Sequence, residues 1–92
     1  MEIKKRMTKP SKKIQNETLI ILMEECGEVI QECSKILRFG NDATKLTKEL
    51  GDLLCMVELT ANHLQIDEDT IEESYESKRE KLKKYSSIIL SD

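Results

Sequence analysis

Long stretches without a helix-breaking residue dominate this chain. Only three glycines and one proline occur in its 92 residues. Nowhere do Val, Ile and aromatic residues alternate with polar ones, as they do in half-buried strands. Apolar residues recur instead at steps of three and four, which is the spacing of one face of an α-helix. The pattern therefore predicts an all-α fold: a helical hairpin followed by a third helix.

The first predicted helix runs from Ser11 or Asn16 to Arg38. Gly40 follows as the residue that can take the left-handed conformation closing a helix. The apolar stripe of this helix comprises Leu19, Leu22, Met23, Cys26, Val29, Ile30, Cys33, Ile36 and Leu37. We expect this stripe to define the main apolar face of the helix.

Two more helices are predicted after Gly40. The second has three candidate N-caps and ends near Gln65; the candidates are Asn41, Asp42 and Thr44. The third starts at Asp67 or Asp69 and runs to about Tyr85, with Asp69 and Glu72 at the spacing of a capping box.

Ile20 and Ile21 point away from the face that Leu19 and Met23 define. A small helical unit with a second apolar face has too little of its own surface to cover both. We therefore expect self-association by helix packing into an oligomeric bundle, as a homodimer or homotetramer.

The formal net charge of −3 hides a strongly uneven distribution. Residues 1–13 carry six basic side chains and one acidic, 14–77 carry four basic and fifteen acidic, and 78–84 carry five basic and one acidic. We divide the chain into a basic N-terminal segment over 1–13, a helical domain over 14–85, and a tail or short helix over 86–92. An acidic middle, in a chain with only three aromatic residues, argues against a nucleic-acid partner.

Neither a membrane segment nor a cysteine framework is predicted. The longest apolar run, Leu19 to Met23, is far shorter than the roughly 20 residues that a membrane helix needs. The basic start is not followed by the apolar stretch of a signal peptide, and three cysteines with one His match no zinc pattern. We expect a cytoplasmic protein with no membrane partner.

Two acidic clusters, each containing a glycine, are the strongest functional signal. They are Glu24-Glu25-Cys26-Gly27-Glu28 and Glu49-Leu50-Gly51-Asp52. A glycine within a helix costs about 1 kcal/mol relative to alanine, so we expect close helix approach at both. The short connection at Gly40 favours an antiparallel hairpin, which lets four carboxylates converge: Glu25, Glu28, Glu49 and Asp52.

Converging carboxylates repel one another unless a cation lies between them. An all-oxygen ligand set of this charge suits Mg²⁺, with Mn²⁺ as a possible substitute. Four carboxylates suggest two or more ions, as in sites that polarise phosphate and generate hydroxide. A solvated acidic face without metal is the alternative.

The double motif resembles that of the MazG-like all-α nucleoside triphosphate pyrophosphohydrolases, which carry E-E-x-x-E and E-x-x-D with both glycines. The stretch 34–40 is similar to small phage-type members. The resemblance implies Mg²⁺-dependent hydrolysis of a nucleoside triphosphate to the monophosphate and pyrophosphate by activated water. It implies that Glu25, Glu28, Glu49 and Asp52 are the metal ligands and that Glu24 beside them orients or deprotonates this water; the alternative for Glu24 is an ordinary surface residue that points outward.

The resemblance also suggests substrate contacts. Lys78 takes the place of a phosphate-contacting Lys, with Arg79 and Lys81 as neighbours, and Asn62 resembles an Asn that contacts the nucleotide. The alternatives are an exposed helix charge and a polar residue near a helix end. His63 lies roughly 16 Å along the helix from Asp52, so we expect it at the surface or rim.

Two other functions stay open at this point. A phosphoribosyl-ATP pyrophosphohydrolase shares the helical metal site but acts on a different substrate. A non-catalytic helical oligomerisation module would carry the same acidic residues only for solubility. Product analysis and Mg²⁺ binding separate these from the first hypothesis.

Overall fold

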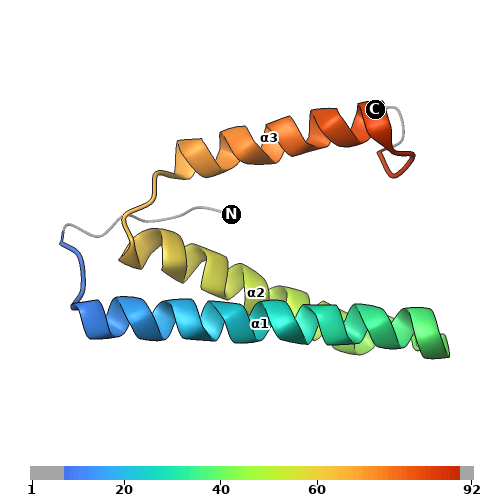
Figure 1. Ribbon diagram of the computed structural model, residues 1–92, viewed down its shortest axis with the longest axis horizontal. Helices are drawn as coiled ribbons and strands as arrows, with labels where there is room; N and C mark the ends of the chain where they lie inside the picture. The colour runs from blue at the N-terminus through green and yellow to red at the C-terminus, as the bar shows by residue number, and fades with distance from the viewer. Residues whose placement is uncertain (1–7, 90–92) are drawn as a thin grey trace.

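The computed structural model describes residues 8–89 of the chain (Figure 1). It contains three helices, α1 (Lys12–Phe39), α2 (Thr44–His63) and α3 (Glu68–Tyr85). Within the described range there is no strand, which confirms the all-α prediction. No described helix is both long and apolar enough to cross a membrane.

Both ends of α1 follow from the sequence. The Ser11 side chain accepts a hydrogen bond from the backbone N–H of Ile14 at 3.3 Å, as an N-cap does. Gly40 closes the helix with φ 69°, and its N–H donates to the carbonyl of Ile36 at 2.9 Å. Of the predicted basic segment, residues 1–7 lie outside the described part, whereas its last two residues belong to α1.

The start of α2 differs from the prediction. Ala43, which has no side-chain acceptor, occupies the N-cap position. The carboxylate of Asp42 instead accepts from the backbone N–H of Thr44 at 3.0 Å, and this hydrogen bond lowers the pKa of Asp42. Asp42 therefore accepts a hydrogen bond from the first turn of α2, although it lies one residue before the N-cap.

The link between α2 and α3 is a tight helix end followed by a new cap. Gln65 has φ 54°, and the N–H of Ile66 donates to the Ala61 carbonyl at 2.8 Å, forming a Schellman motif. Asp67 then caps α3 by accepting from the N–H of Asp69 at 3.1 Å. The predicted capping box is therefore wrong, because Asp69 already lies in the first turn.

Close packing joins α1 and α2 into the predicted antiparallel hairpin, while α3 stands apart from it (Figure 1). No residue of α3 is buried. Among the described residues, the only buried apolar side chains are Met56 and Ala61. The core of this single chain is therefore thin and lies within the hairpin.

The face of α1 that packs on α2 is not the one with the most apolar residues. Thr18 and Glu32 are buried, and Ile21 is partly buried. Of the nine residues of the expected main stripe, Leu22, Val29 and Ile36 are partly buried, and the other six are exposed. We call its six outward residues the exposed stripe: Leu19, Met23, Cys26, Ile30, Cys33 and Leu37. Its members Met23, Ile30 and Leu37 are 72%, 68% and 86% exposed.

Hydrogen bonds explain how polar residues occupy the hairpin interface. The Thr18 hydroxyl donates to the Ile14 carbonyl at 2.8 Å, and it lies 2.8 Å from Nδ1 of His63. Because the single hydroxyl hydrogen is used, His63 donates from Nδ1 to Thr18. His63 therefore joins the two helices from a partly buried position rather than standing on the rim.

A groove of about 510 Å³ lies between α2 and the first half of α3. Leu54 and Val57 line it from α2, and Ile71 and Tyr75 from α3. Successive helix residues turn by about 100°, and α1 and α2 run antiparallel, so the exposed stripe lies on the same side of the hairpin as Leu54. Beyond α3, Ile88 is 70% exposed, and residues 90–92 of the predicted tail lie outside the described part.

Candidate metal centre

Three of the predicted acidic residues meet between the two helices of the hairpin. Glu25 comes from α1, and Glu49 and Asp52 lie one turn apart on α2. Each offers a carboxylate oxygen, and these oxygens lie within 4.8 Å of one another. All three side chains are partly buried. We call these residues the carboxylate triad.

The electrostatics of the triad favour a cation. Oε2 of Glu25 is buried and has no hydrogen-bond partner. Burial raises the pKa of Glu25, and the negative charges of Asp52, Glu49 and Glu28 raise it further. A divalent ion with a preference for oxygen ligands would offset both the burial of the Glu25 carboxylate and its repulsion by the neighbouring negative charges. The donor set therefore fits Mg²⁺ or Mn²⁺.

Glu28 and Glu24 lie outside the triad. The Glu28 side chain is exposed, yet it is near enough for its charge to raise the pKa of Glu25. Glu24 is exposed on the same helix. The structure thus brings together three of the five acidic residues named from the sequence and leaves two beside them.

The glycines of the two motifs do not mark close helix approach in this chain. A Cβ atom built on Gly27 or Gly51 would meet nothing within 4 Å. Both residues lie about 200° round their helices from a triad member, Glu25 or Glu49, and so face away from the hairpin interface. The expected contact between the helices at these glycines is therefore wrong for the single chain.

A basic residue that the sequence analysis missed lies at the triad. Nζ of Lys48 is 3.5 Å from Oδ2 of Asp52 and 3.8 Å from Oε1 of Glu49. These two carboxylates raise the pKa of Lys48, Asp52 having the larger effect. The available signal was spacing, because Lys48 precedes Asp52 by four residues and so shares its side of the helix.

The basic residues predicted to bind substrate lie on α3, away from the triad. Lys78 and Lys81 are exposed, and the guanidinium of Arg79 lies 5.9 Å from the centre of the Tyr75 ring. None of the three is among the charges that shift the pKa of Glu25. Lys78 and Lys81 line a shallow depression together with Glu73, Ser74 and Ser77.

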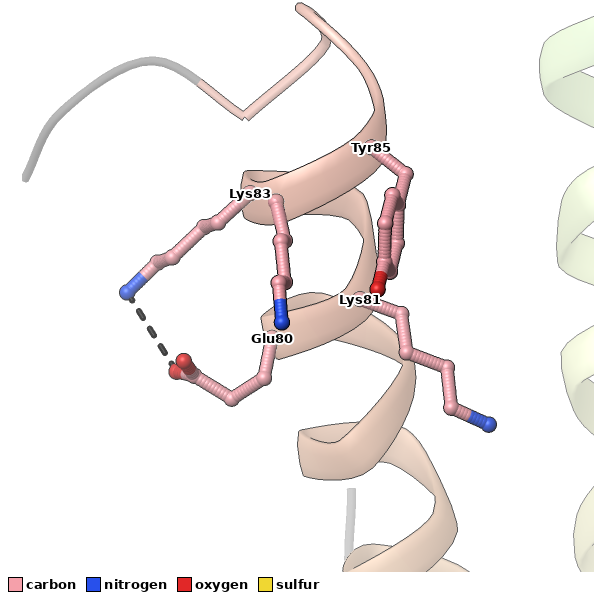
Figure 2. A pocket seen from close by; sticks show the side chains of 5 residues that line it. Glu80, Lys81, Lys83 and Tyr85 are labelled. Carbon is pink, nitrogen blue, oxygen red and sulfur yellow. Dashed lines mark hydrogen bonds and ion pairs between the residues drawn. The ribbon is translucent and has the colours of Figure 1, made fainter.

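Figure 2 shows the basic end of α3. Nζ of Lys83 lies 3.5 Å from Oε1 of Glu80, while Lys81 extends to the other side of the helix. Lys81 therefore remains directed away from this ion pair.

Asn62, in the last turn of α2, is partly buried and lies about 15 Å along the axis from Asp52. One chain does not bring these residues to the triad.

The triad and α3 also face different sides of the hairpin. At 100° per residue, Glu28, Lys48 and Asp52 fall on the side opposite to Leu54 and the exposed stripe. The groove lined by Leu54 and Tyr75 places α3 on the Leu54 side. The open edge of the triad is therefore directed away from the α3 helix of the same chain.

Comparison with known protein families gives a match over most of the chain. Residues 14–86 match the family model described as MazG nucleotide pyrophosphohydrolase domain. This range includes α2, α3 and all but the first two residues of α1. No curated protein and no solved structure matches the chain.

Proposed function

Because the chain belongs to the MazG nucleotide pyrophosphohydrolase domain family, we propose that it hydrolyses nucleoside triphosphates to nucleoside monophosphate and pyrophosphate with Mg²⁺. Deoxy- and non-standard nucleotides are included in this substrate class. The observation that carries the proposal is the carboxylate triad, with its buried, unpartnered oxygen on Glu25.

We assign the roles within the site by position. Glu25, Glu49 and Asp52 hold Mg²⁺, which Mn²⁺ can replace, and Glu28, one turn after Glu25, supplies a fourth carboxylate for a further ion. The metal supplies polarisation of the phosphate and a lowered pKa of bound water. Glu24 orients the attacking water or takes its proton. Positioning and charge stabilisation supply most of the catalysis.

The protein must also neutralise the triphosphate. We assign phosphate contacts to Lys78, with Arg79 and Lys81 beside it, and a nucleotide contact to Asn62. Their side chains lie on α3 and at the end of α2, whereas the triad opens on the other side of the same hairpin. These contacts therefore require a second chain or a different position of α3.

We propose that a second copy of the chain covers the exposed stripe, giving a homodimer or a homotetramer. Three of its large apolar residues are more than two-thirds exposed, and the hairpin buries only two apolar side chains among those described. Exposed apolar surface of this extent on one face marks an interaction site.

The direct test is a panel of nucleoside triphosphates and phosphoribosyl-ATP, incubated with Mg²⁺ and scored separately for pyrophosphate and orthophosphate. We expect pyrophosphate and the monophosphate in equal amounts, and no turnover in EDTA. Orthophosphate as the product would contradict the proposal. Turnover of phosphoribosyl-ATP alone would assign the alternative substrate, and no turnover at all would favour the non-catalytic module.

A further inference from the structure

Lys48 is the basic group that the structure places at the carboxylate triad. Its ammonium lies 3.5 Å from Asp52 and 3.8 Å from Glu49. Its side chain is 74% exposed, whereas that of Glu49 is 15% exposed. Lys48 therefore lies at the solvent edge of the triad, with its stem outside the hairpin core.

The same edge is the solvent-exposed side of the triad. Glu25 closes the inner side of the triad, where its Oε2 is buried, while Asp52 is the more exposed ligand on α2. Lys48 and Asp52 share one side of α2 because they are four residues apart. The Lys48 ammonium therefore lies next to any phosphate bound to an ion that Asp52 and Glu49 hold.

We propose that Lys48 binds a non-bridging oxygen of the substrate's polyphosphate at the mouth of the triad. The inference rests on the proposed function and adds a specific phosphate contact to it. On substrate binding, the ammonium exchanges its contact with an exposed carboxylate for one with phosphate, which carries more charge. Unlike the basic residues of α3, Lys48 makes this contact from the chain that supplies the triad.

Two binding experiments test Lys48 without requiring turnover. Calorimetry measures the affinity for inorganic tripolyphosphate at saturating Mg²⁺, and separately the affinity for Mg²⁺ alone. The variants are Lys48→Met and Lys48→Arg. The control is Lys13→Met, which removes the same charge from an exposed lysine about 18 Å along α1 from Glu25.

We expect Lys48→Met to weaken tripolyphosphate binding about three- to tenfold, and Lys48→Arg to retain binding within about twofold because the charge remains. Lys13→Met should bind as the original chain does. Mg²⁺ should bind Lys48→Met at least as tightly, since a neighbouring positive charge is gone. With a nucleoside triphosphate, KM should rise by the same factor while kcat changes little.

Unchanged tripolyphosphate binding in Lys48→Met would overturn the inference, whatever the Mg²⁺ affinity, and leave Lys48 as a counter-ion of Asp52 and Glu49 only. Equal weakening in Lys13→Met would also overturn it, because any positive charge would then suffice. Absence of Mg²⁺-dependent tripolyphosphate binding in the original chain would instead remove the proposed function itself.

Discussion

The hairpin and α3 are built from helices of similar quality, yet they differ in what fixes them. Both α1 and α3 have side-chain caps at their first turns. The hairpin buries its interface residues, whereas α3 buries none. Local sequence therefore specifies α3 as a helix but not its place, while packing specifies the relative position of the triad carboxylates.

The largest expected effect tests the hairpin half of this comparison. Replacing Asp52 by Ala removes a carboxylate of the triad that is partly exposed, so the helices should persist. We expect Mg²⁺-dependent pyrophosphate release to fall by about 10³-fold or more, with helicity by circular dichroism largely retained. The control is Glu17→Ala, an exposed acidic residue about 12 Å along α1 from Glu25. Equal turnover in the Asp52 and Glu17 variants would refute the triad.

The second effect tests whether a second copy covers the exposed stripe of the hairpin. Ile30→Glu places a charge in the exposed stripe, and burying it against a second copy would be costly. We expect the dimer dissociation constant, measured by sedimentation equilibrium, to rise at least about tenfold. Gln31→Glu, on an exposed neighbouring position outside the stripe, should leave it unchanged. A chain that is monomeric at micromolar concentration before substitution would disprove self-association.

A smaller effect concerns the negative charge of the Glu25 carboxylate in the triad. The folded pKa of Glu25 lies above its ordinary value of 4.5, so the folded state binds the proton more tightly than the unfolded state. In EDTA, the ionised carboxyl destabilises the fold at neutral pH, and this penalty is lost as pH falls through the raised pKa.

Glu25→Gln should therefore be more stable than the original chain at pH 7, and this difference should shrink toward pH 4.5. Urea unfolding of both proteins across that range measures the difference. A gap that stays constant with pH would show that Glu25 ionisation does not oppose folding.

The smallest effect tests the link that joins the two regions. Gln65 adopts φ 54° at the end of α2, a conformation that costs a non-glycine residue about 1–2 kcal/mol. Gln65→Gly should raise the free energy of unfolding by up to about 1 kcal/mol after the larger chain entropy of glycine is included. Thermal denaturation measures this gain, and Gly40→Ala, at φ 69°, should show the opposite sign. A destabilised Gln65→Gly would mean that side-chain contacts hold the link.

Helix ends were predictable where one residue had a single capping role. Gly40 is such a residue, and its prediction was confirmed, whereas the start of α1 was left open between Ser11 and Asn16 and the structure uses Ser11. Around Asp42 and Asp69, several neighbouring polar residues offered the same hydrogen bond; the structure uses Asp42 from one residue before the α2 N-cap, and Asp67, one of the two predicted starts, as the α3 N-cap. Sequence chemistry identified the caps but not their register.

The orientation of α1 could not be read from hydrophobicity alone. The interface face includes the buried residues Thr18 and Glu32. Thr18 is satisfied by hydrogen bonds to the Ile14 carbonyl and to His63, and Glu32 by an ion pair with Lys35 at 3.3 Å. The more apolar face carries Ile30 and remains exposed in one chain. The exposed apolar face, which we propose a second copy covers, has the same pattern in the sequence as a core face, because both are apolar.

The triad was foreseen from the spacing of Glu25, Glu49 and Asp52, because neighbouring helix turns and a short connection bring such residues together. Lys48 was missed, since a lysine beside two acidic residues is usually only a surface ion pair. The position of Lys78 relative to the triad depends on α3, which local sequence does not fix.

The most direct test of the central claim is Mn²⁺ binding followed by electron paramagnetic resonance, because free Mn²⁺ gives a signal that binding diminishes. We predict that the chain binds Mn²⁺ in competition with Mg²⁺, and that Glu49→Gln weakens this binding at least about tenfold. Glu17→Gln should leave it unchanged. Mn²⁺ binding that is undetectable, or equal in the Glu49 and Glu17 variants, would contradict a metal centre in the hairpin.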